Sequence, residues 1–148
     1  MNADQEKEYV FYLEWEDAEK ESFKVGFLAE INKMFYFVIS KKQSAELAYN
    51  KGFVGIPGFN PGEIYYSSEL FDFFERRVLD KKGINPCTEL AKTQGRSLVD
   101  SFYLEEVPME KSDQYKKLII DIVEMQQRKK IKDMKKRKIM QEKNDRII

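Results

Sequence analysis

The aromatic residues of this chain are confined to one stretch of it. All eleven Phe, all eight Tyr and the single Trp lie between Tyr9 and Tyr115, although 35% of the 148 residues are charged. Large apolar side chains concentrated in this way require a core, and a chain of this length can bury one. The distribution predicts a folded domain over residues 1–108 and a polar helical extension over residues 109–148.

The two regions also differ in charge. Residues 1–108 carry 13 Lys and Arg against 19 Asp and Glu, a net charge of −6, whereas residues 109–148 carry 13 against 7, a net charge of +6. A basic extension of this kind can bind a polyanion, the acidic domain of its own chain, or that of a neighbouring copy. The sequence leaves these three alternatives open.

Cysteine content and hydropathy indicate where the protein works. Cys87 is the single cysteine and cannot form an internal disulfide, so nothing points to an oxidising compartment. The sequence has neither an apolar run near 18 residues nor a secretory leader pattern. We therefore expect a cytoplasmic protein with no membrane partner.

Four segments have the composition of β-strands. In Tyr9–Trp15 and Phe23–Ala29, apolar residues alternate, which places Phe23, Val25 and Phe27 on one face. Met34–Ser40 is a continuous aromatic and β-branched run, and Leu98–Val107 is similar in composition. The short links between the first three segments predict an antiparallel meander that the fourth can join.

Helix signals separate the strands and follow them. Ser44–Lys51 predicts a short helix with Ser44 near its N-cap, and Ser67 is predicted to open a second helix that continues to Val78. Asn85 and Pro86 predict a third helix, which ends at Gly95, and a long helix follows from Met109. The fold class predicted is α+β, with an antiparallel sheet, two or three short helices and a long, basic C-terminal helix.

The loop over residues 52–62 is a candidate docking surface. It holds four of the seven glycines and two of the four prolines, so it cannot be a regular element. A structural turn is the favoured interpretation, but Phe53, Ile56 and Phe59 would form a protein-binding patch if they were exposed together. Arg76 and Arg77, beside the Phe-rich segment, are further candidates because they can bind a phosphate or a partner's carboxylate.

The strongest charge cluster lies in the C-terminal helix. It consists of Arg128, Lys129, Lys130, Lys132, Lys135, Lys136, Arg137 and Lys138, with one acidic residue among them. Such a helix can bind nucleic acid through phosphate contacts. No aromatic residue follows Tyr115 to stack on bases, so a solvated or coiled-coil helix is an equally good interpretation.

The sequence offers little for catalysis. It contains no histidine and one cysteine, so the usual zinc sites and Cys–His or Ser–His–Asp arrangements lack their partners. The acidic run over residues 14–21 fits a charged turn between strands better than a metal site. We expect no enzymatic activity, no cofactor and no bound metal.

Two segments carry a resemblance to a known family. Leu70-Phe-Asp-Phe-Phe-Glu-Arg-Arg77 and Gly95-Arg-Ser-Leu-Val-Asp-Ser-Phe-Tyr-Leu-Glu-Glu-Val-Pro108, with the Val25-Gly26-x-Leu28 step, resemble the N-terminal subdomain of HipA-type toxin kinases. The resemblance covers residues 9–107. Arg76-Arg77-Val78-Leu79 replaces the family's Leu-Pro-Glu step, Asp100-Ser101 replaces its Gly-Ala, and the basic extension has no counterpart.

The resemblance implies a function. In HipA-type kinases this subdomain packs on the kinase core and contributes to antitoxin contacts, and HipS-type proteins carry it as a separate small chain that restrains the kinase. We therefore expect a non-catalytic protein-interaction module, an accessory or antitoxin-like regulator of a HipA-type kinase in a toxin–antitoxin system. The alternative is a nucleic-acid-binding accessory protein that acts through its basic helix, for example in a phage or mobile element.

Overall fold

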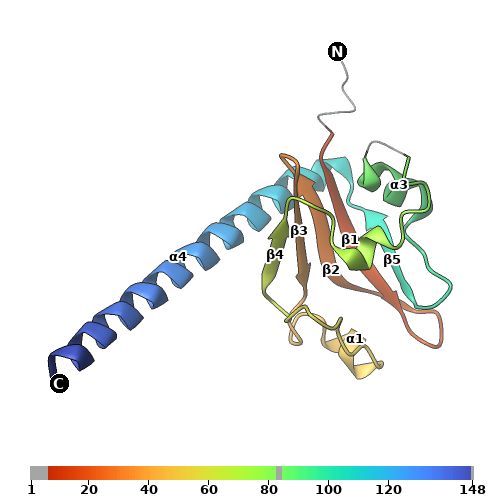
Figure 1. Cartoon of the computed structure of the whole chain (residues 1–148). Coiled ribbons are helices and arrows are strands. Elements are labelled where there is room, and N and C mark those ends of the chain that lie inside the picture. The colour runs from red at the N-terminus through yellow and green to blue at the C-terminus, as the bar shows by residue number, and fades with distance from the viewer. Residues whose placement is uncertain (1–6, 83–84, 148) are drawn as a thin grey trace, which may run out of the picture. The chain divides into compact units, whose positions relative to one another are not determined.

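The computed structural model describes residues 7–82 and 85–147 (Figure 1). The chain divides into two compact units, Met1–Lys116 and Lys117–Ile148. We call the first unit the head domain. Its boundary lies within the C-terminal helix, beyond the boundary predicted at residue 108, so the first turns of that helix belong to the head domain.

The head domain is built on a five-stranded antiparallel sheet with the strand order β4-β3-β2-β1-β5. The strands are β1 (Tyr9–Glu16), β2 (Ser22–Ile31), β3 (Met34–Ile39), β4 (Ile64–Ser67) and β5 (Phe102–Glu106). The α+β fold class and the meander of the first three strands are confirmed, and β5 joins the sheet beside β1. Sequence analysis missed β4, a four-residue edge strand.

A β-bulge in the β1–β2 pair corrects the predicted face of β2. Leu13 pairs with Gly26 but Glu14 pairs with Lys24, so β2 contains one extra residue at Val25. The extra residue shifts the alternation of side chains beyond it. Leu28 therefore joins Val25 in the core, while Phe27 lies on the opposite face, against the predicted alternation.

Within residues 7–82 and 85–147, four helices complete the fold. They are α1 (Glu46–Asn50), α2 (Asp72–Glu75), α3 (Pro86–Thr93) and α4 (Met109–Ile147). The predicted N-cap of α3 is confirmed, because the Asn85 side chain accepts a hydrogen bond from the amide of Cys87. The C-cap is Gln94, with φ +60°, and Gly95, where the helix was predicted to end, follows it with φ +59°. The N-cap of α1 is Ala45, while the Ser44 hydroxyl donates to the Lys41 carbonyl.

The helix predicted to open at Ser67 begins at Asp72 instead. Ser67 is the last residue of β4 and pairs with Phe35, and Phe71 is extended, with φ −61° and ψ 142°. Edge pairing to β3 thus takes Ser67, and residues 68–71 connect β4 to α2 without forming a helical turn.

The two faces of the sheet are covered by different elements. On one face, α1, the 52–62 loop, α2 and α3 contribute to a single core, in which the fully buried Phe74 packs edge-on to Phe37 with ring centroids 4.9 Å apart. On the other face, Tyr115 from the start of α4 contacts Tyr12 and Phe27, at centroid distances of 5.6 and 5.0 Å. Of the described residues, none lies in a helix long and apolar enough to cross a membrane.

Candidate docking groove and basic helix

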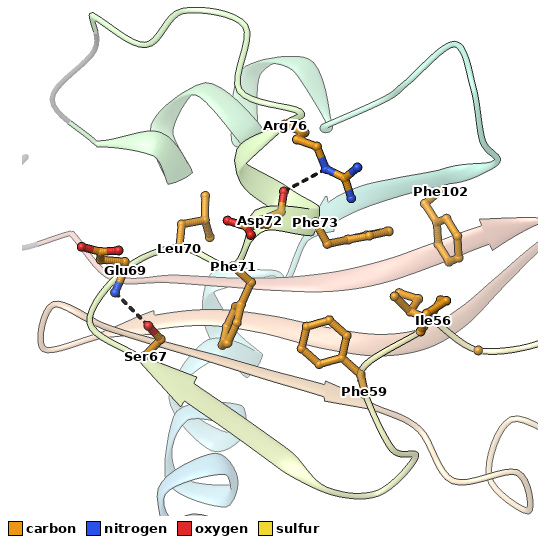
Figure 2. A pocket seen from close by; sticks show the side chains of 12 residues that line it. Ile56, Phe59, Ser67, Glu69, Leu70, Phe71, Asp72, Phe73, Arg76 and Phe102 are labelled. Atoms are coloured by element: carbon orange, nitrogen blue, oxygen red, sulfur yellow. Dashed lines mark hydrogen bonds between the residues drawn. The ribbon is translucent and has the colours of Figure 1, made fainter.

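A groove of about 670 Å³ opens between the 52–62 loop, α2 and the start of β5 (Figure 2). We call it the aromatic groove. Its apolar wall is formed by Ile56, Phe59, Phe71, Phe73 and Phe102, and Ser67, Glu69, Asp72 and Arg76 supply polar groups. Ile56 is buried and the four phenylalanines are half-buried, so each ring is anchored in the core and also presents a surface to the groove.

The wall is held in place by contacts among its own rings. Phe59 packs edge-on against Phe37, Tyr65 and Phe71, at centroid distances of 4.8, 5.0 and 5.8 Å. An isolated β-bridge between Ile56 and Phe59 closes the loop that carries them. The shape of the groove is therefore set before any ligand arrives.

Of the three predicted loop residues, only Phe59 has a large half-exposed side chain. Phe53 is 3% exposed and packs between Trp15 and Tyr49, at centroid distances of 5.7 and 5.0 Å. Ile56 is 7% exposed, at the base of the groove. A patch formed by all three exposed side chains is therefore contradicted, because the loop uses Phe53 and Ile56 to cover the sheet.

The two predicted arginines have different positions. Arg76 is exposed at the margin of the groove, and its Nε donates to the Asp72 carbonyl at 3.3 Å. Arg77 is 7% exposed, donates to the carbonyls of Phe73 and Gly95 at 3.1 and 3.0 Å, and forms an ion pair with Asp100. The structure therefore corrects the prediction of Arg77 as a surface contact, since its donors are engaged within the head domain.

A second groove, of about 460 Å³, meets the aromatic groove at Glu69 and Leu70. Phe35, Val78 and Pro86 contribute apolar surface to it, and Glu75, Asp80 and Lys81 add charges. The exposed charged residues of the two grooves together are Glu69, Asp72, Glu75 and Asp80 against Arg76 and Lys81. We call the four carboxylates the acidic margin. The acidic margin was not predicted from the sequence, because Glu69 was assigned to a helix that begins only at Asp72.

The predicted nucleic-acid-binding residues all lie on α4 and all are exposed. They are Arg128, Lys129, Lys130, Lys132, Lys135, Lys136, Arg137 and Lys138. Arg128 is 3.8 Å from the Glu124 carboxylate one turn earlier. Ile131 and Met134 are exposed among these cations, by 52% and 68%. We call residues 128–138 the basic segment.

Metal ligands and the cysteine thiol are the other candidate reactive groups of the head domain. Within the described ranges, no group of three or more His, Cys, Asp or Glu side chains is placed to hold a metal ion. Burial, with a smaller contribution from Glu30, raises the pKa of the Cys87 thiol, and this side chain is fully enclosed in the core. A buried, protonated thiol is a poor nucleophile.

Comparison of the chain with protein-family models, with curated proteins and with solved structures finds no match in any of the three. The resemblance to the N-terminal subdomain of HipA-type kinases therefore stays a prediction.

Proposed function

We propose that this protein is a non-catalytic protein-interaction module that holds apolar side chains of a partner in the aromatic groove. The observation that carries the proposal is the wall of half-buried, mutually packed phenylalanine rings beside charged groups. Aromatic pockets of fixed shape are where binding energy concentrates in protein interfaces, because desolvating the rings is favourable and little side-chain entropy is lost.

The resemblance over residues 9–107 suggests the partner. In this proposal the protein is a cytoplasmic accessory regulator of a HipA-type kinase, and the aromatic groove receives a segment of that kinase. The groove involves Leu70–Arg76 and Phe102, which belong to the two segments that carry the resemblance. Because the protein contributes no catalytic group, its effect on the kinase would come from binding alone.

The test uses the full chain and a purified HipA-type kinase, with affinity measured by titration calorimetry. Phe71→Ala removes a ring that faces the groove, and it should weaken binding at least about tenfold, since burying one phenylalanine is worth about 1.5–3 kcal/mol. Val54→Ala is the matched control, because Val54 is 92% exposed in the same region and does not line the groove. Equal affinity of a folded Phe71→Ala variant and the parent would contradict the proposal.

A second function, nucleic-acid binding by α4, is favoured by one observation. All eight cations of the basic segment are exposed. We propose weak, sequence-independent binding to DNA or RNA, with a dissociation constant on the order of 10⁻⁴–10⁻⁶ M at physiological salt.

This second function is tested by fluorescence anisotropy with a labelled duplex at several salt concentrations. Replacing Lys129, Lys130, Lys135 and Lys136 by Gln should reduce the salt slope by about 3–4, if each lysine neutralises one phosphate. A head-domain variant with Lys41, Lys42, Lys51 and Lys92 replaced by Gln carries the same charge change and should retain the slope. Tight, sequence-selective binding that survives high salt would count against the interaction-module proposal.

A further inference from the structure

The charge around the grooves restricts what can occupy them. Glu69, Asp72, Glu75 and Asp80 are exposed there, with only Arg76 and Lys81 to balance them. A ligand that brought carboxylates to this surface would meet net repulsion, whereas one with several cations would be attracted and oriented. A partner that combines apolar anchors with positive charge therefore fits this surface.

The basic segment of α4 has this combination. It carries eight cations and one carboxylate, and its Ile131 and Met134 side chains are exposed. Residues at i and i+3 lie on one face of a helix, so these two can enter a groove together while neighbouring lysines reach its margin. A methionine thioether also contacts aromatic rings favourably, and four phenylalanine rings form most of the apolar wall of the aromatic groove.

The basic segment lies on one long, continuous helix. The helix is unbroken from Met109 onwards and has no Gly or Pro. At about 1.5 Å per residue, residues 128 and 138 lie roughly 28 and 44 Å along the helix from its start. Tyr115 packs on the Tyr12–Phe27 face, while Phe59 at the groove packs on Phe37 in the opposite face. A second copy of the chain can present this continuous helix to the groove.

We propose that the aromatic groove and its acidic margin bind the basic segment of a second copy of this chain. This inference rests on the proposed function of the groove as a protein-docking site and gives it an occupant other than the kinase segment. If each copy offers both surfaces, two reciprocal contacts form a symmetric dimer, the commonest closed arrangement of identical chains. Dimerisation should weaken as salt rises, because the attraction is between exposed charges.

The test is sedimentation velocity of the full chain and of two charge-reversed variants. One replaces Glu69, Asp72 and Glu75 by Lys, and the other replaces Lys129, Lys130, Lys135 and Lys136 by Glu. All seven side chains are exposed, so both variants should keep the parental circular dichroism spectrum. Each variant alone would oppose like charges, and its self-association should be weaker than that of the parent by at least about tenfold.

An equimolar mixture of the two variants provides the decisive measurement. The groove of the variant with the reversed acidic margin is positive and faces the reversed basic segment of the other variant. The unchanged, negative groove of that other variant faces the unchanged basic segment. Both contacts are restored, so a heterodimer should form from two chains that are monomeric alone. A wild-type chain that stays monomeric at low salt and high concentration would overturn the inference, as would a mixture that shows no association.

The outcome for dimerisation is distinguishable from that for the proposed function. A monomeric wild type whose kinase binding still falls on Phe71→Ala would refute the second-copy occupant and leave the docking function supported. If the mixture dimerises and the wild-type chain does not bind the kinase, the second copy is supported as the occupant of the groove and the kinase is contradicted as the partner. Nucleic-acid binding is separable as well, because reversing the basic segment should abolish it and reversing the acidic margin should not.

Discussion

Arg77 joins three segments of the head domain from a buried position. Its guanidinium donates to the carbonyls of Phe73 and Gly95, forms an ion pair with Asp100, and lies 4.3 Å from the centroid of the Phe73 ring. A buried cation is tolerated only when its charge and donors are satisfied in this way. Because Phe73 lines the aromatic groove, the contacts of Arg77 help to fix the groove's shape.

Removing the partner of Arg77 should therefore be costly. Asp100→Asn leaves the buried guanidinium without its counter-charge, and we expect the free energy of unfolding to fall by about 3 kcal/mol. Asp133→Asn, an exposed substitution of the same kind on α4, should change it by less than about 0.5 kcal/mol. Urea denaturation measures both. A loss for Asp100→Asn as small as that of the control would mean that Arg77 does not depend on this ion pair.

Gly95 is the second residue where local geometry gives a sharp expectation. Its φ is +59°, and a Cβ there would lie 3.2 Å from Leu90 Cδ2 and 3.4 Å from Leu104 Cδ1. Gly95→Ala should cost about 1 kcal/mol for the left-handed backbone, and Gly95→Val should cost more, since its branched side chain meets both leucines. Thermal unfolding of the two variants would show this order. Equal stability of both variants and the parent would contradict it.

At the scale of elements, the sequence predicts what depends on local signals. Alternating apolar residues mark β1, a continuous aromatic and β-branched run marks β3, and the Asn85-Pro86 start marks α3. Three features required knowledge of long-range pairing. The bulge at Val25 depends on the register with β1, β4 exists because β3 offers an edge, and α2 is short because β4 takes Ser67.

The candidate site shows the same limit. Arg76 and Phe59 were predicted as contact residues, and both line the aromatic groove. Phe71 and Phe102 were not predicted as contact residues. Periodicity assigned Phe71 to a helix, but its backbone is extended, and Phe102 reaches the groove from β5. The burial of Arg77 could not be predicted either, since its ion-pair partner Asp100 lies 23 residues away in the sequence. The basic segment was fully predictable, because local composition alone defines it.

Three charged side chains from neighbouring strands, Glu14 of β1, Lys24 of β2 and Glu105 of β5, interact with one another. Burial raises the pKa of Glu14; Lys24 Nζ, 3.1 Å away, opposes the shift, and a hydrogen bond and charge repulsion with Glu105 add to it. The folded protein therefore holds a proton on Glu14 at pH values where the unfolded chain has lost it. The contribution of Glu14 to the free energy of unfolding is therefore largest below pH about 4.3, and it falls as pH rises from there through the raised pKa.

Glu14→Gln tests this sign. The variant cannot titrate at this position, so the difference in unfolding free energy, wild type minus variant, should decrease as pH rises above about 4.3 and level off once Glu14 is ionised in both states. Urea midpoints measured across the acid range would give the curve. Parallel pH profiles for the two proteins, or a difference that grows with pH, would contradict the assignment.

For the whole molecule, the division of charge coincides broadly with the division of structure. The acidic region contains the sheet and its core, and the basic segment is exposed on a helix in the second unit. Separating opposite charges along one chain makes an interaction with another molecule, whether a second copy or a polyanion, electrostatically favourable. We expect the head domain to fold without the basic segment.

Two truncations test this separation of folding from binding. A chain that ends at Gln127 loses residues 128–148, whose described side chains are all exposed, and its thermal midpoint should equal that of the parent. A chain that ends at Pro108 also loses Tyr115, which contacts two rings and accepts a hydrogen bond from the Tyr12 hydroxyl at 3.2 Å, and Lys116, which pairs with Glu8 at 3.1 Å.

The shorter chain should still fold, because every strand lies before Pro108, but its midpoint should fall by roughly 5–10 °C, from about 0.5–1.5 kcal/mol for each lost aromatic pair. Tyr115→Ala in the full chain is the matched control and should reproduce part of that fall. If the shorter chain gave a circular dichroism spectrum of an unfolded chain, residues 109–116 would be required for folding. If ending at Gln127 lowered the midpoint as much as ending at Pro108, the basic segment would belong to the folding unit.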